Sequence, residues 1–301
     1  MNYKYLLKNK EIRLKILKLL DFVPDKMMVY IQYYISTGRW LNLSNPKRYT
    51  EKLQWYKLNY RDKLLTQCAD KYKVREYVSS KGLDNILIPL HGVYNDAEDI
   101  NFDLLPKTFV LKTTNGSHTN ILCKDKNTLD TTKTKTQLNQ WLNDWVGKMG
   151  REWAYYDIEP KIVCEEFLNV DSDKELDDYK FFCFDGEIYC LYLVVDREST
   201  NDTKLGIFDK DFNKLKYNRN DILPIINNIE KPKNYDQMIN IVKILSEDFP
   251  HVRVDLYNID GKIYFGELTF YDGSGYKGYS PDIFDYMLGE KFNIKNIKKD
   301  N

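Results

Sequence analysis

The residues best suited to chemistry lie in the segment RVDLYNIDGKIYFGELTF, which begins at Arg253. Its two halves are rich in branched and aromatic residues, which favour β-strands, and Asp260 and Gly261 between them are a strong hairpin signal. Residues two apart in a strand share a face, so Asp255 lies on the same face as Arg253, and Thr269 on the same face as Glu267. Two carboxylates beside a hydroxyl and a guanidinium could hold a magnesium ion whose other ligands are phosphate oxygens.

The register of this hairpin decides whether the acidic groups meet. A two-residue turn places Asp255 opposite Gly266 and sends Glu267 to the other face. A three-residue loop over residues 260–262 places Asp255 opposite Glu267 on one face, and an equivalent β-bulge would do the same. A metal site therefore requires the longer loop or a bulge. The alternative is a surface hairpin whose charged face is solvated.

Three further segments carry groups suited to phosphate. FVLKTTNGS places Lys112 at the end of a strand, before a loop that contains Gly116 and Ser117, while DKYKVREY places Arg75 on a helix and DYKFF offers Lys180. A cation at a strand end, a Gly/Ser loop with free amide groups and a carboxylate pair together describe a nucleoside triphosphate site. No segment is specific alone, and the inference rests on their order and spacing.

The composition excludes several other classes of protein. The chain has 301 residues, room for two or three modest domains or lobes, and 45 basic residues balance 45 acidic ones, so no basic field favours nucleic acid. None of the three histidines lies beside a Ser or Cys nucleophile pattern, which argues against triad hydrolysis. The cysteines lack metal-site spacing, which indicates free thiols in a cytoplasmic protein; they are Cys68, Cys123, Cys164, Cys183 and Cys190.

Helices and hairpins alternate along the chain, which predicts an α+β fold and not a doubly wound parallel sheet. Ser280 is a candidate cap for the last helix, and the five tryptophans, Trp40 among them, are expected to pack in the core or between lobes. Helices are predicted within residues 1–65, 70–82, 131–146, 235–247 and 280–292, and strands at 89–94, 107–112, 121–126 and 162–168, in a hairpin over 179–195 and in the hairpin that begins at Arg253.

The ordered segments YTEKLQWYK, DKYKVREYV, LPKTFVLKTTNGS, DYKFFCFDG and RVDLYNIDGKIYFGELTF resemble the ATP-grasp superfamily over residues 45–290, and within it the TupA-like branch, which is named for teichuronopeptide synthesis. The resemblance implies an α+β ATP-grasp fold, in which two α+β lobes clasp ATP and Mg²⁺. It divides the chain into a helical N-terminal segment, 1–65, N-terminal and central subdomains, 66–160, and a C-terminal lobe with the metal site, 161–301.

The resemblance also implies a role for each motif residue. Arg75 stands where relatives carry a phosphate-binding lysine, and Thr269 stands where most relatives have asparagine as a metal ligand. The catalytic residues would be Arg253, Lys112 and Gly273, with Gly275 in the loop near the acceptor carboxylate. ATP would be bound by Arg75, Lys112, Gly116, Ser117, Lys180, the ribose-binding Asp178 and the adenine hinge of Glu165, Glu166, Phe167 and Leu168; magnesium would be bound by Asp255, Glu267 and Thr269.

The reaction that the resemblance implies is an ATP-dependent joining of a carboxylate and an amine through an acylphosphate. One substrate is expected to be a cell-surface polysaccharide of capsule or teichuronic type, or its nucleotide- or lipid-linked precursor. A phosphotransferase on the same fold and a non-catalytic nucleotide-binding module are alternatives. A glycosyltransferase would need a DxD motif after a suitable strand, and the two literal matches, at residues 171–173 and 209–211, lack that setting.

Several residues keep a simpler explanation. Lys112 and Lys180 could be ordinary strand lysines, Glu166 a solvated charge and His118 a solvated loop residue. Residues 1–20 form a basic, leucine-striped helix, which either packs on the protein or lies on an anionic membrane. The expected location is therefore cytoplasmic, with peripheral contact at the inner membrane face as the second interpretation.

Overall fold

The computed structural model describes residues 10–117, 119–143, 146–168, 176–196, 203–295 and 297. Their helices are α2 (Lys10–Leu19), α3 (Asp25–Thr37), α4 (Tyr49–Asn59), α5 (Lys63–Ala69), α6 (Val74–Ser80), α7 (Thr131–Leu142), α8 (Val146–Met149), α9 (Tyr235–Ser246) and α10 (Ile283–Lys291). Their strands are β1 (Leu90–Tyr94), β2 (Phe109–Thr113), β3 (Asn120–Cys123), β4 (Ile162–Glu166), β5 (Asp178–Phe184), β6 (Glu187–Val195), β7 (Lys204–Asp209), β8 (Asn218–Arg219), β9 (Leu223–Pro224), β10 (His251–Ile259), β11 (Lys262–Thr269) and β12 (Tyr279–Ser280). Short 3-10 helices η1 to η6 lie between them, of which η5 is Trp153–Tyr155 and η6 is Asp272–Gly275.

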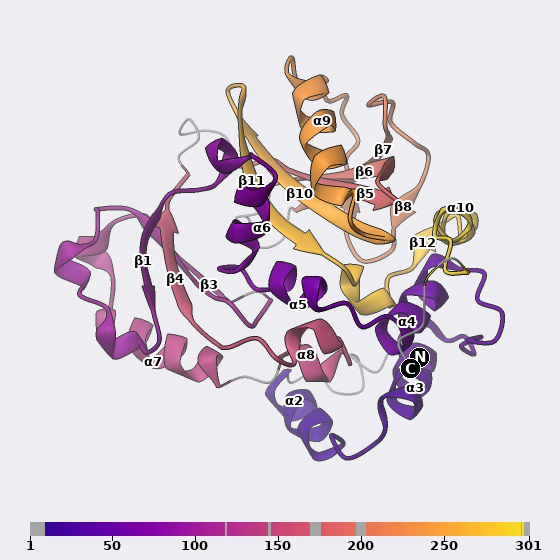
Figure 1. The fold of residues 1–301 in the computed structure, drawn as a ribbon, viewed down its shortest axis with the longest axis horizontal. Helices are drawn as coiled ribbons and strands as arrows, with labels where there is room; N and C mark the ends of the chain where they lie inside the picture. The colour runs from indigo at the N-terminus through magenta and orange to yellow at the C-terminus, as the bar shows by residue number, and fades with distance from the viewer. Residues whose placement is uncertain are drawn as a thin grey trace.

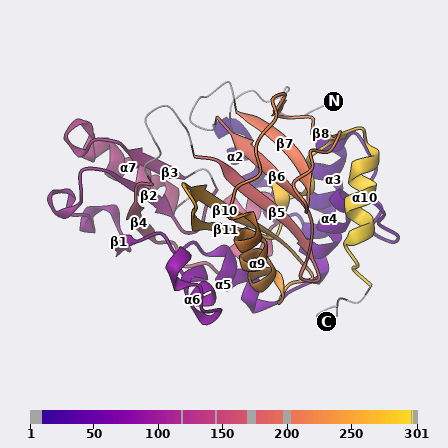
Figure 2. The same cartoon turned by 90° about the horizontal axis from the view of Figure 1, so that it is seen from above.

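Two sheets organise these elements. A four-stranded sheet has the order β1-β4-β2-β3, and a six-stranded sheet has the order β11-β10-β5-β6-β7-β9. Figure 1 shows the small sheet on the left and the large sheet at the upper right, and Figure 2 shows the large sheet between the small sheet and helices α3, α4 and α10. The α+β prediction is confirmed.

The small sheet sets one row of side chains against α7 and the other toward the large sheet. Phe109 and Leu111 of β2 are fully buried in a core that Leu138 of α7 completes. Lys112 of β2 and Glu165 of β4 lie on the opposite face, because β2 and β4 pair in the register Leu111↔Cys164. Since β4 belongs to this sheet, the expected division after residue 160 does not coincide with the change from one sheet to the other.

The large sheet contains both expected hairpins. Asp185 and Gly186 connect β5 to β6, and Asp260 and Gly261 connect β10 to β11, each pair with positive φ as a tight two-residue turn requires. On the face that carries Val254, helix α9 covers the sheet; the ring of its Tyr235 lies 6.1 Å from that of Phe181. Strand β7 was not among the expected elements.

A β-bulge, not a longer turn, brings Asp255 opposite Glu267. The pairing begins as Ile259↔Lys262 and continues to Leu256↔Phe265, then shifts at Gly266 so that Asp255 pairs with Glu267. A Cβ on Gly266 would lie 2.9 Å from the carbonyl oxygen of Asp255, closer than side chains approach. The three-residue loop is therefore wrong, and the bulge, which was the other way to form the site, is present.

The N-terminal helices close the face of the large sheet opposite α9. The Tyr49 hydroxyl of α4 lies 2.9 Å from Nε2 of the buried His251, whose Nδ1 donates to the carbonyl of Cys183 at 2.9 Å. Helix α4 also packs on α10, where the Thr50 amide donates to Asp285 at 3.0 Å. Helix α10 begins after Asp282 and not at Ser280, which belongs to β12, so the predicted cap is wrong.

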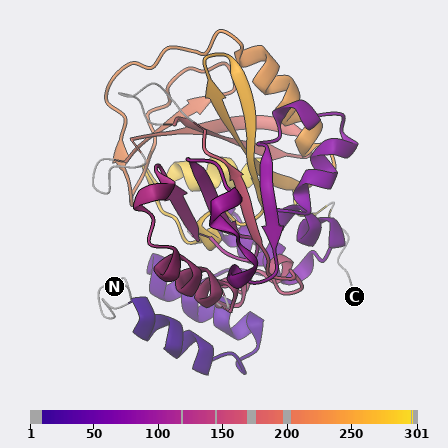
Figure 3. The same ribbon diagram turned by 90° about the vertical axis from the view of Figure 1, so that its left-hand side faces the viewer.

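Helices α2 and α3 form an edge of the molecule (Figure 3). Trp40, expected to pack in the core or between lobes, is 80% exposed and stacks on Tyr34, with ring centroids 4.5 Å apart. No helix in the described part of the chain is long and apolar enough to cross a lipid bilayer. All five cysteines are buried and free, as expected.

Candidate active site

Arg253 is the centre of a buried charge cluster on the large sheet. Its Nε and Nη2 donate to the two carboxylate oxygens of Asp255, each at 2.7 Å. Nη2 also lies 3.0 Å from Glu267 Oε1 and 3.0 Å from the Thr269 hydroxyl, and Nη1 donates to Asp272. The cross-strand register brings these side chains together as the sequence predicted, whereas Asp272 was not expected among them.

The two carboxylates of the cluster differ in their surroundings. Burial raises the pKa of Asp255 to about 6 in spite of Arg253 and Lys180. Burial also acts to raise the pKa of Glu267, but Arg253, Lys180 and Lys71 outweigh it and hold that pKa at about 2. The Glu267 side chain is 47% exposed and that of Asp255 only 1%. Glu267 is therefore the more acidic and the more accessible carboxyl group of the pair.

Lys180 and Asp178 extend the cluster along β5. Lys180 Nζ lies 2.6 Å from Asp178 Oδ2 and donates to Asp255. The residue predicted to bind ribose, Asp178, is thus buried next to the predicted metal site. Lys180 is only slightly exposed and lies between two carboxylates, so it is not the solvated hairpin lysine of the simpler explanation.

A pocket between the sheets collects the predicted phosphate-binding cations. Its lining includes Lys112 of β2, Arg75 of α6 and Gly266 of β11. Lys112 Nζ donates to Glu165 Oε2 at 2.6 Å, and Arg75 Nη1 lies 3.8 Å from Glu165 Oε1. Burial acts to lower the pKa of Lys112, but the Glu165 carboxylate outweighs it and raises that pKa, so Lys112 stays charged.

Lys71 was missed by the sequence interpretation. It lines the same pocket and donates to the carbonyls of Thr113, at 3.1 Å, and Gly116. Burial lowers the pKa of Lys71 to about 8, although nearby Glu267 opposes this. The neighbouring Asp70 was the sequence feature that could have indicated Lys71. Its carboxylate accepts from the amides of Tyr72 and Lys73, and this turn fixes the backbone position of Lys71.

The Gly/Ser loop after β2 is tied to its surroundings. The hydroxyls of Thr113 and Thr119 lie 2.8 Å apart across its base, and the Thr114 amide donates to the Lys161 carbonyl at 2.9 Å. Gly116 is buried and Ser117 exposed, while His118 lies outside the described residues. Lys71 links the loop to the turn between α5 and α6 through its hydrogen bonds to the carbonyls of Thr113 and Gly116.

The predicted hinge lies at the end of β4. The Glu166 amide donates to the Pro89 carbonyl at 2.9 Å, and the Glu166 side chain is exposed. Phe167 and Leu168 are partly buried and follow directly. The Glu165 side chain contacts Lys112 and Arg75 instead, and the backbone role predicted for Glu165 did not anticipate these contacts.

The predicted acceptor loop, η6, has an unusual backbone. Gly273, Ser274 and Gly275 all have positive φ, at 51°, 57° and 69°. A Cβ on Gly275 would lie 2.4 Å from the Gln54 side chain, so glycine permits the close approach of α4. The Gln54 amide donates to the carbonyls of Ser274, at 2.9 Å, and Gly275, at 3.1 Å.

Lys57 anchors the same loop from one turn further along α4. This lysine is fully buried and donates to the carbonyls of Gly150, at 2.8 Å, and Ser274, at 3.0 Å. The Ser274 hydroxyl in turn donates to Glu152. Burial lowers the pKa of Lys57 to about 8 even though the Glu152 carboxylate opposes it. Two side chains of α4 therefore fix the backbone of the predicted acceptor loop.

The side chains of Asp255, Glu267 and Thr269 are suited to a magnesium ion whose remaining ligands are phosphate oxygens. Among the described residues, no cluster of three or more Asp, Glu, His or Cys side chains could enclose a metal ion. Asp255 and Glu267 nevertheless face one another beside the Thr269 hydroxyl. Magnesium in nucleotide-binding sites usually has one or two carboxylate ligands, together with phosphate oxygens and water. Glu267 would be the exposed ligand and Asp255 the buried one.

Comparison with protein-family models shows which family the chain belongs to. The model described as TupA-like ATPgrasp matches residues 51–293, which is most of the chain. The protein belongs to the TupA-like ATP-grasp family. The match begins within α4 and ends beyond α10, so it includes both sheets, the Arg253 cluster and the helix beneath the acceptor loop.

Solved structures resemble this TupA-like protein in fold only. D-alanine–D-alanine ligase from Bacillus anthracis, solved with ATP, has 16% identity, a TM-score of 0.40 and an alignment over 67% of this chain and 55% of its own. L-amino acid ligase from Bacillus licheniformis has 13% identity, a TM-score of 0.41 and an alignment over 90% of this chain and 57% of its own. The chain thus spans little more than half of each structure. The search of curated proteins found no significant match.

Proposed function

We propose that this TupA-like protein is an ATP-dependent carboxylate–amine ligase. The observation that carries the proposal is the arrangement of the pocket. Lys71, Lys112 and Arg75 line it from the small lobe and the adjoining turn, and the Asp255–Glu267 pair lies beside its β11 wall. In a chain of this family, cations suited to phosphate thus line a pocket whose Gly266 is the neighbour in sequence of Glu267, a member of the acidic pair suited to magnesium.

The proposed reaction has two steps. A carboxylate oxygen of the acceptor attacks the γ-phosphorus of ATP, the bond to ADP breaks, and an acylphosphate forms. An amine nitrogen then attacks the acyl carbon, inorganic phosphate leaves, and the nitrogen gives up a proton as the amide forms. Magnesium, bound by Asp255 and Glu267, would neutralise phosphate charge during the first step.

The residues of the chain would each contribute to charge or position. Lys71, Lys112 and Arg75 would bind the phosphates through charge-assisted hydrogen bonds. Arg253 is held by carboxylates on two sides and would present a fixed positive charge to the transferred phosphoryl group, which needs no reorganisation during reaction. The loop of residues 273–275, fixed by α4, would position the acceptor carboxylate.

We further propose that one substrate belongs to a cell-surface polysaccharide or to its precursor, with an amino acid or amine attached to it. The support is the relationship to the TupA-like branch. The chemistry suits either an amino acid joined to an amino sugar or an amine joined to a uronic acid.

An ADP-release assay with Mg²⁺ and ATP tests the reaction. Uronic acids and amino acids are screened against pooled amines and amino sugars, with Glu267→Gln as the inactive control. A ligase requires both an acid and an amine for ADP release. Release with an acid or sugar alone would show phosphoryl transfer instead, and absence of magnesium-dependent ATP binding would overturn both.

A further inference from the structure

Helices α2 and α3 expose an apolar surface at the edge of the molecule. Phe22 in the turn between them is 82% exposed, and Leu19 at the end of α2 is 74% exposed. Met27, Ile31 and Tyr34 recur at helical spacing along the outer side of α3, while Val29 and Tyr33 on its inner side are fully buried. The α2–α3 surface consists of Leu19, Phe22, Met27, Ile31, Tyr34 and Trp40.

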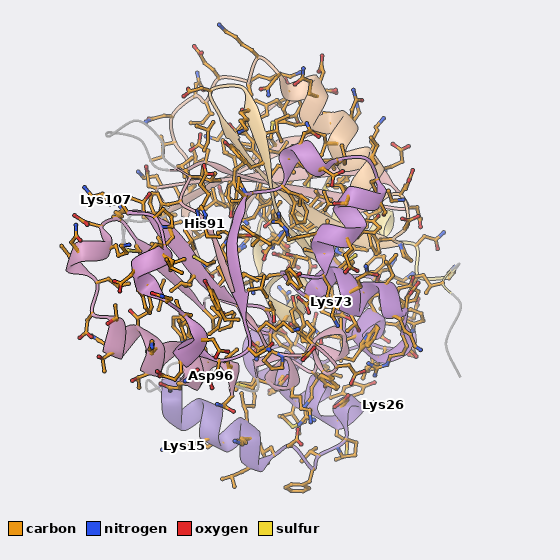
Figure 4. The ribbon with its side chains drawn as sticks, turned by 60° about the vertical axis from the view of Figure 1, so that its left-hand side comes forward. Lys15, Lys26, Lys73, His91, Asp96 and Lys107 are labelled. Atoms are coloured by element: carbon orange, nitrogen blue, oxygen red, sulfur yellow. The ribbon has the colours of Figure 1, made fainter. Side chains whose placement is uncertain are left out.

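Exposed lysines lie near this surface in the sequence, whereas two neighbouring aspartates are directed to a buried arginine. Lys15, Lys18 and Lys26 are exposed beside it, and Figure 4 shows Lys15 and Lys26 on α2 and α3 at the lower edge of the molecule. Asp21 and Asp25, two of the three acidic residues between residues 10 and 40, turn inward instead; the third is Glu11 in α2. Asp25 pairs with the buried Arg151 at 3.0 Å, and Asp21 lies 4.0 Å from the same arginine.

We propose that the α2–α3 surface docks on an anionic lipid bilayer. Apolar and aromatic side chains flanked by lysines are the composition of helices that lie in the membrane interface. The sequence before it reinforces the sign of the charge, because residues 1–9 carry Lys4 and Lys8 and no acidic residue. The surface extends beyond the basic helix expected at residues 1–20, since α3 and Trp40 supply half or more of its apolar groups.

The same charges disfavour a second copy of the chain as the occupant. A two-fold symmetric contact would place Lys15, Lys18 and Lys26 of one copy near the same lysines of the other. Asp21 and Asp25, the two acids that lie between these lysines in the sequence, are already directed to Arg151. An anionic surface satisfies the lysines and covers the apolar side chains together.

Docking there would bring the membrane close to the acceptor loop. Helix α3 presents Gln32 on its inner side, where the side-chain amide donates to the Met149 carbonyl at 2.8 Å. The Tyr276 hydroxyl, directly after η6, donates to Gln32 Oε1 at 2.8 Å. Only the thickness of α3 therefore separates the proposed membrane face from the loop predicted to hold the acceptor. The docking proposal itself does not depend on the reaction.

Vesicle co-sedimentation of the full chain tests the proposal. Phosphatidylcholine vesicles with about one third phosphatidylglycerol are compared with pure phosphatidylcholine at low and high salt. We expect binding to the anionic vesicles that high salt weakens. Since each basic residue near an anionic surface contributes roughly a factor of five to binding, Lys15→Glu/Lys18→Glu/Lys26→Glu should weaken binding on the order of 100-fold. Phe22→Ser/Trp40→Ser should weaken it at least about tenfold.

Matched variants control for charge and hydrophobicity elsewhere on the surface. Lys107→Glu/Lys133→Glu/Lys216→Glu changes three exposed lysines, and Leu104→Ser/Ile226→Ser removes apolar side chains that are 82% and 84% exposed. Both controls should bind as the wild type does. Lack of binding at low salt, or equal loss in the control variants, would overturn the proposal. So would a wild-type dimer in light scattering that Phe22→Ser/Trp40→Ser converts to monomers without any vesicle binding.

Discussion

At the scale of single residues, Arg253 determines what its neighbours can do. One guanidinium contacts Asp255, Glu267, Thr269 and Asp272, and two of these carboxylates are almost wholly inaccessible. Buried carboxylates need such a partner because they have lost their hydration. The arginine is therefore both a structural counter-charge and the proposed contact to the transferred phosphoryl group.

Removal of Arg253 should destabilise the fold as well as abolish activity. Arg253→Met leaves Asp255 and Asp272 without their shared cation, and loss of one partner of a buried pair costs about 3–5 kcal/mol. Adding Asp272→Asn should recover part of this loss, because it removes one of the two buried charges. Urea unfolding of the single and double variants measures both effects. A stability of Arg253→Met equal to that of the wild type would contradict the buried network.

Lys71 and Lys112 should give ATP binding a defined pH dependence. Lys71 has a pKa lowered to about 8, whereas that of Lys112 is raised, so Lys71 loses its proton first as the pH rises. The positive charge that attracts phosphate is present below pH 8 and lost above it, so the Kd for ATP should increase up to about tenfold per pH unit there.

The Lys71→Arg variant provides the comparison, because arginine stays charged throughout this range. Calorimetric titration between pH 7 and 9.5 should show a flat profile for the variant and a rising Kd for the wild type. Parallel profiles would mean that another group titrates.

The residue types of the site could be predicted from the sequence, but some of its members could not. Arg253, Asp255, Glu267 and Lys112 stand at strand positions whose spacing indicates their faces. Asp272 was not predicted as a member of the site, because it follows β11 in an irregular turn, where no periodicity indicates the direction of a side chain.

At the scale of elements, helix α4 is a platform for the acceptor loop. Lys57 and Gln54 both donate to carbonyls of η6, in which residues 273–275 all have positive φ and so need support from their surroundings. A helix is stiffer than a loop, so hydrogen bonds from α4 restrict the movement of η6.

Substitution of Lys57 should lower kcat more than it changes ATP affinity. Lys57→Met keeps the apolar stem but removes the donor of the Gly150 carbonyl and one of the two donors of the Ser274 carbonyl, which also accepts from Gln54. An unsatisfied buried carbonyl costs roughly 1–3 kcal/mol. We expect at least a tenfold loss of kcat, because the loop would lose its position, with an unchanged Kd for ATP.

Lys52 offers a matched control on the same helix. It also donates to two carbonyls, those of Gly289 and Phe292, on the side away from the loop. Lys52→Met should destabilise the protein without the specific loss of kcat. Equal losses of kcat in both variants would reduce the role of Lys57 to general stability.

The elements themselves were largely predictable, while their exact pairing was not. The two-residue turns at Asp185 and Asp260 are strong local signals, and amphipathic α9 was recognised within one residue. The bulge at Gly266 depends on the approach of two strands, which no local pattern reveals, although an isolated glycine within a strand is consistent with one. The membership of β4 in the small sheet is likewise a tertiary choice.

At the scale of the whole molecule, the pocket joins the two sheets. Lys112 and Glu165 come from the small sheet, Phe265 and Gly266 from the large one, and Lys71 and Arg75 from the turn and helix between them. A ligand bound there contacts both lobes, so its binding energy adds to the stability of both.

ATP with magnesium should therefore stabilise the entire protein. A ligand present at about 100 times its Kd adds about 2.7 kcal/mol to the free energy of unfolding. Thermal unfolding should show a single transition that moves upward with Mg²⁺ and ATP, and Lys112→Met should shift less at the same ATP concentration. Two separate transitions, of which ATP moves only one, would contradict a ligand shared by both lobes.

The packing of α4 on α10 has a consequence for how the chain is made. The Thr50 amide donates to Asp285 at 3.0 Å, and a Cβ on Gly289 would lie 2.8 Å from the backbone nitrogen of Tyr49, so α10 approaches the backbone at the start of α4 closely. Their residues are separated by most of the sequence, and α4 leaves the ribosome long before α10 does. Until α10 and Phe292 directly after it emerge, the rings of Tyr49 and Tyr56 lack the aromatic contact that Phe292 provides, so a nascent chain would expose part of this apolar surface.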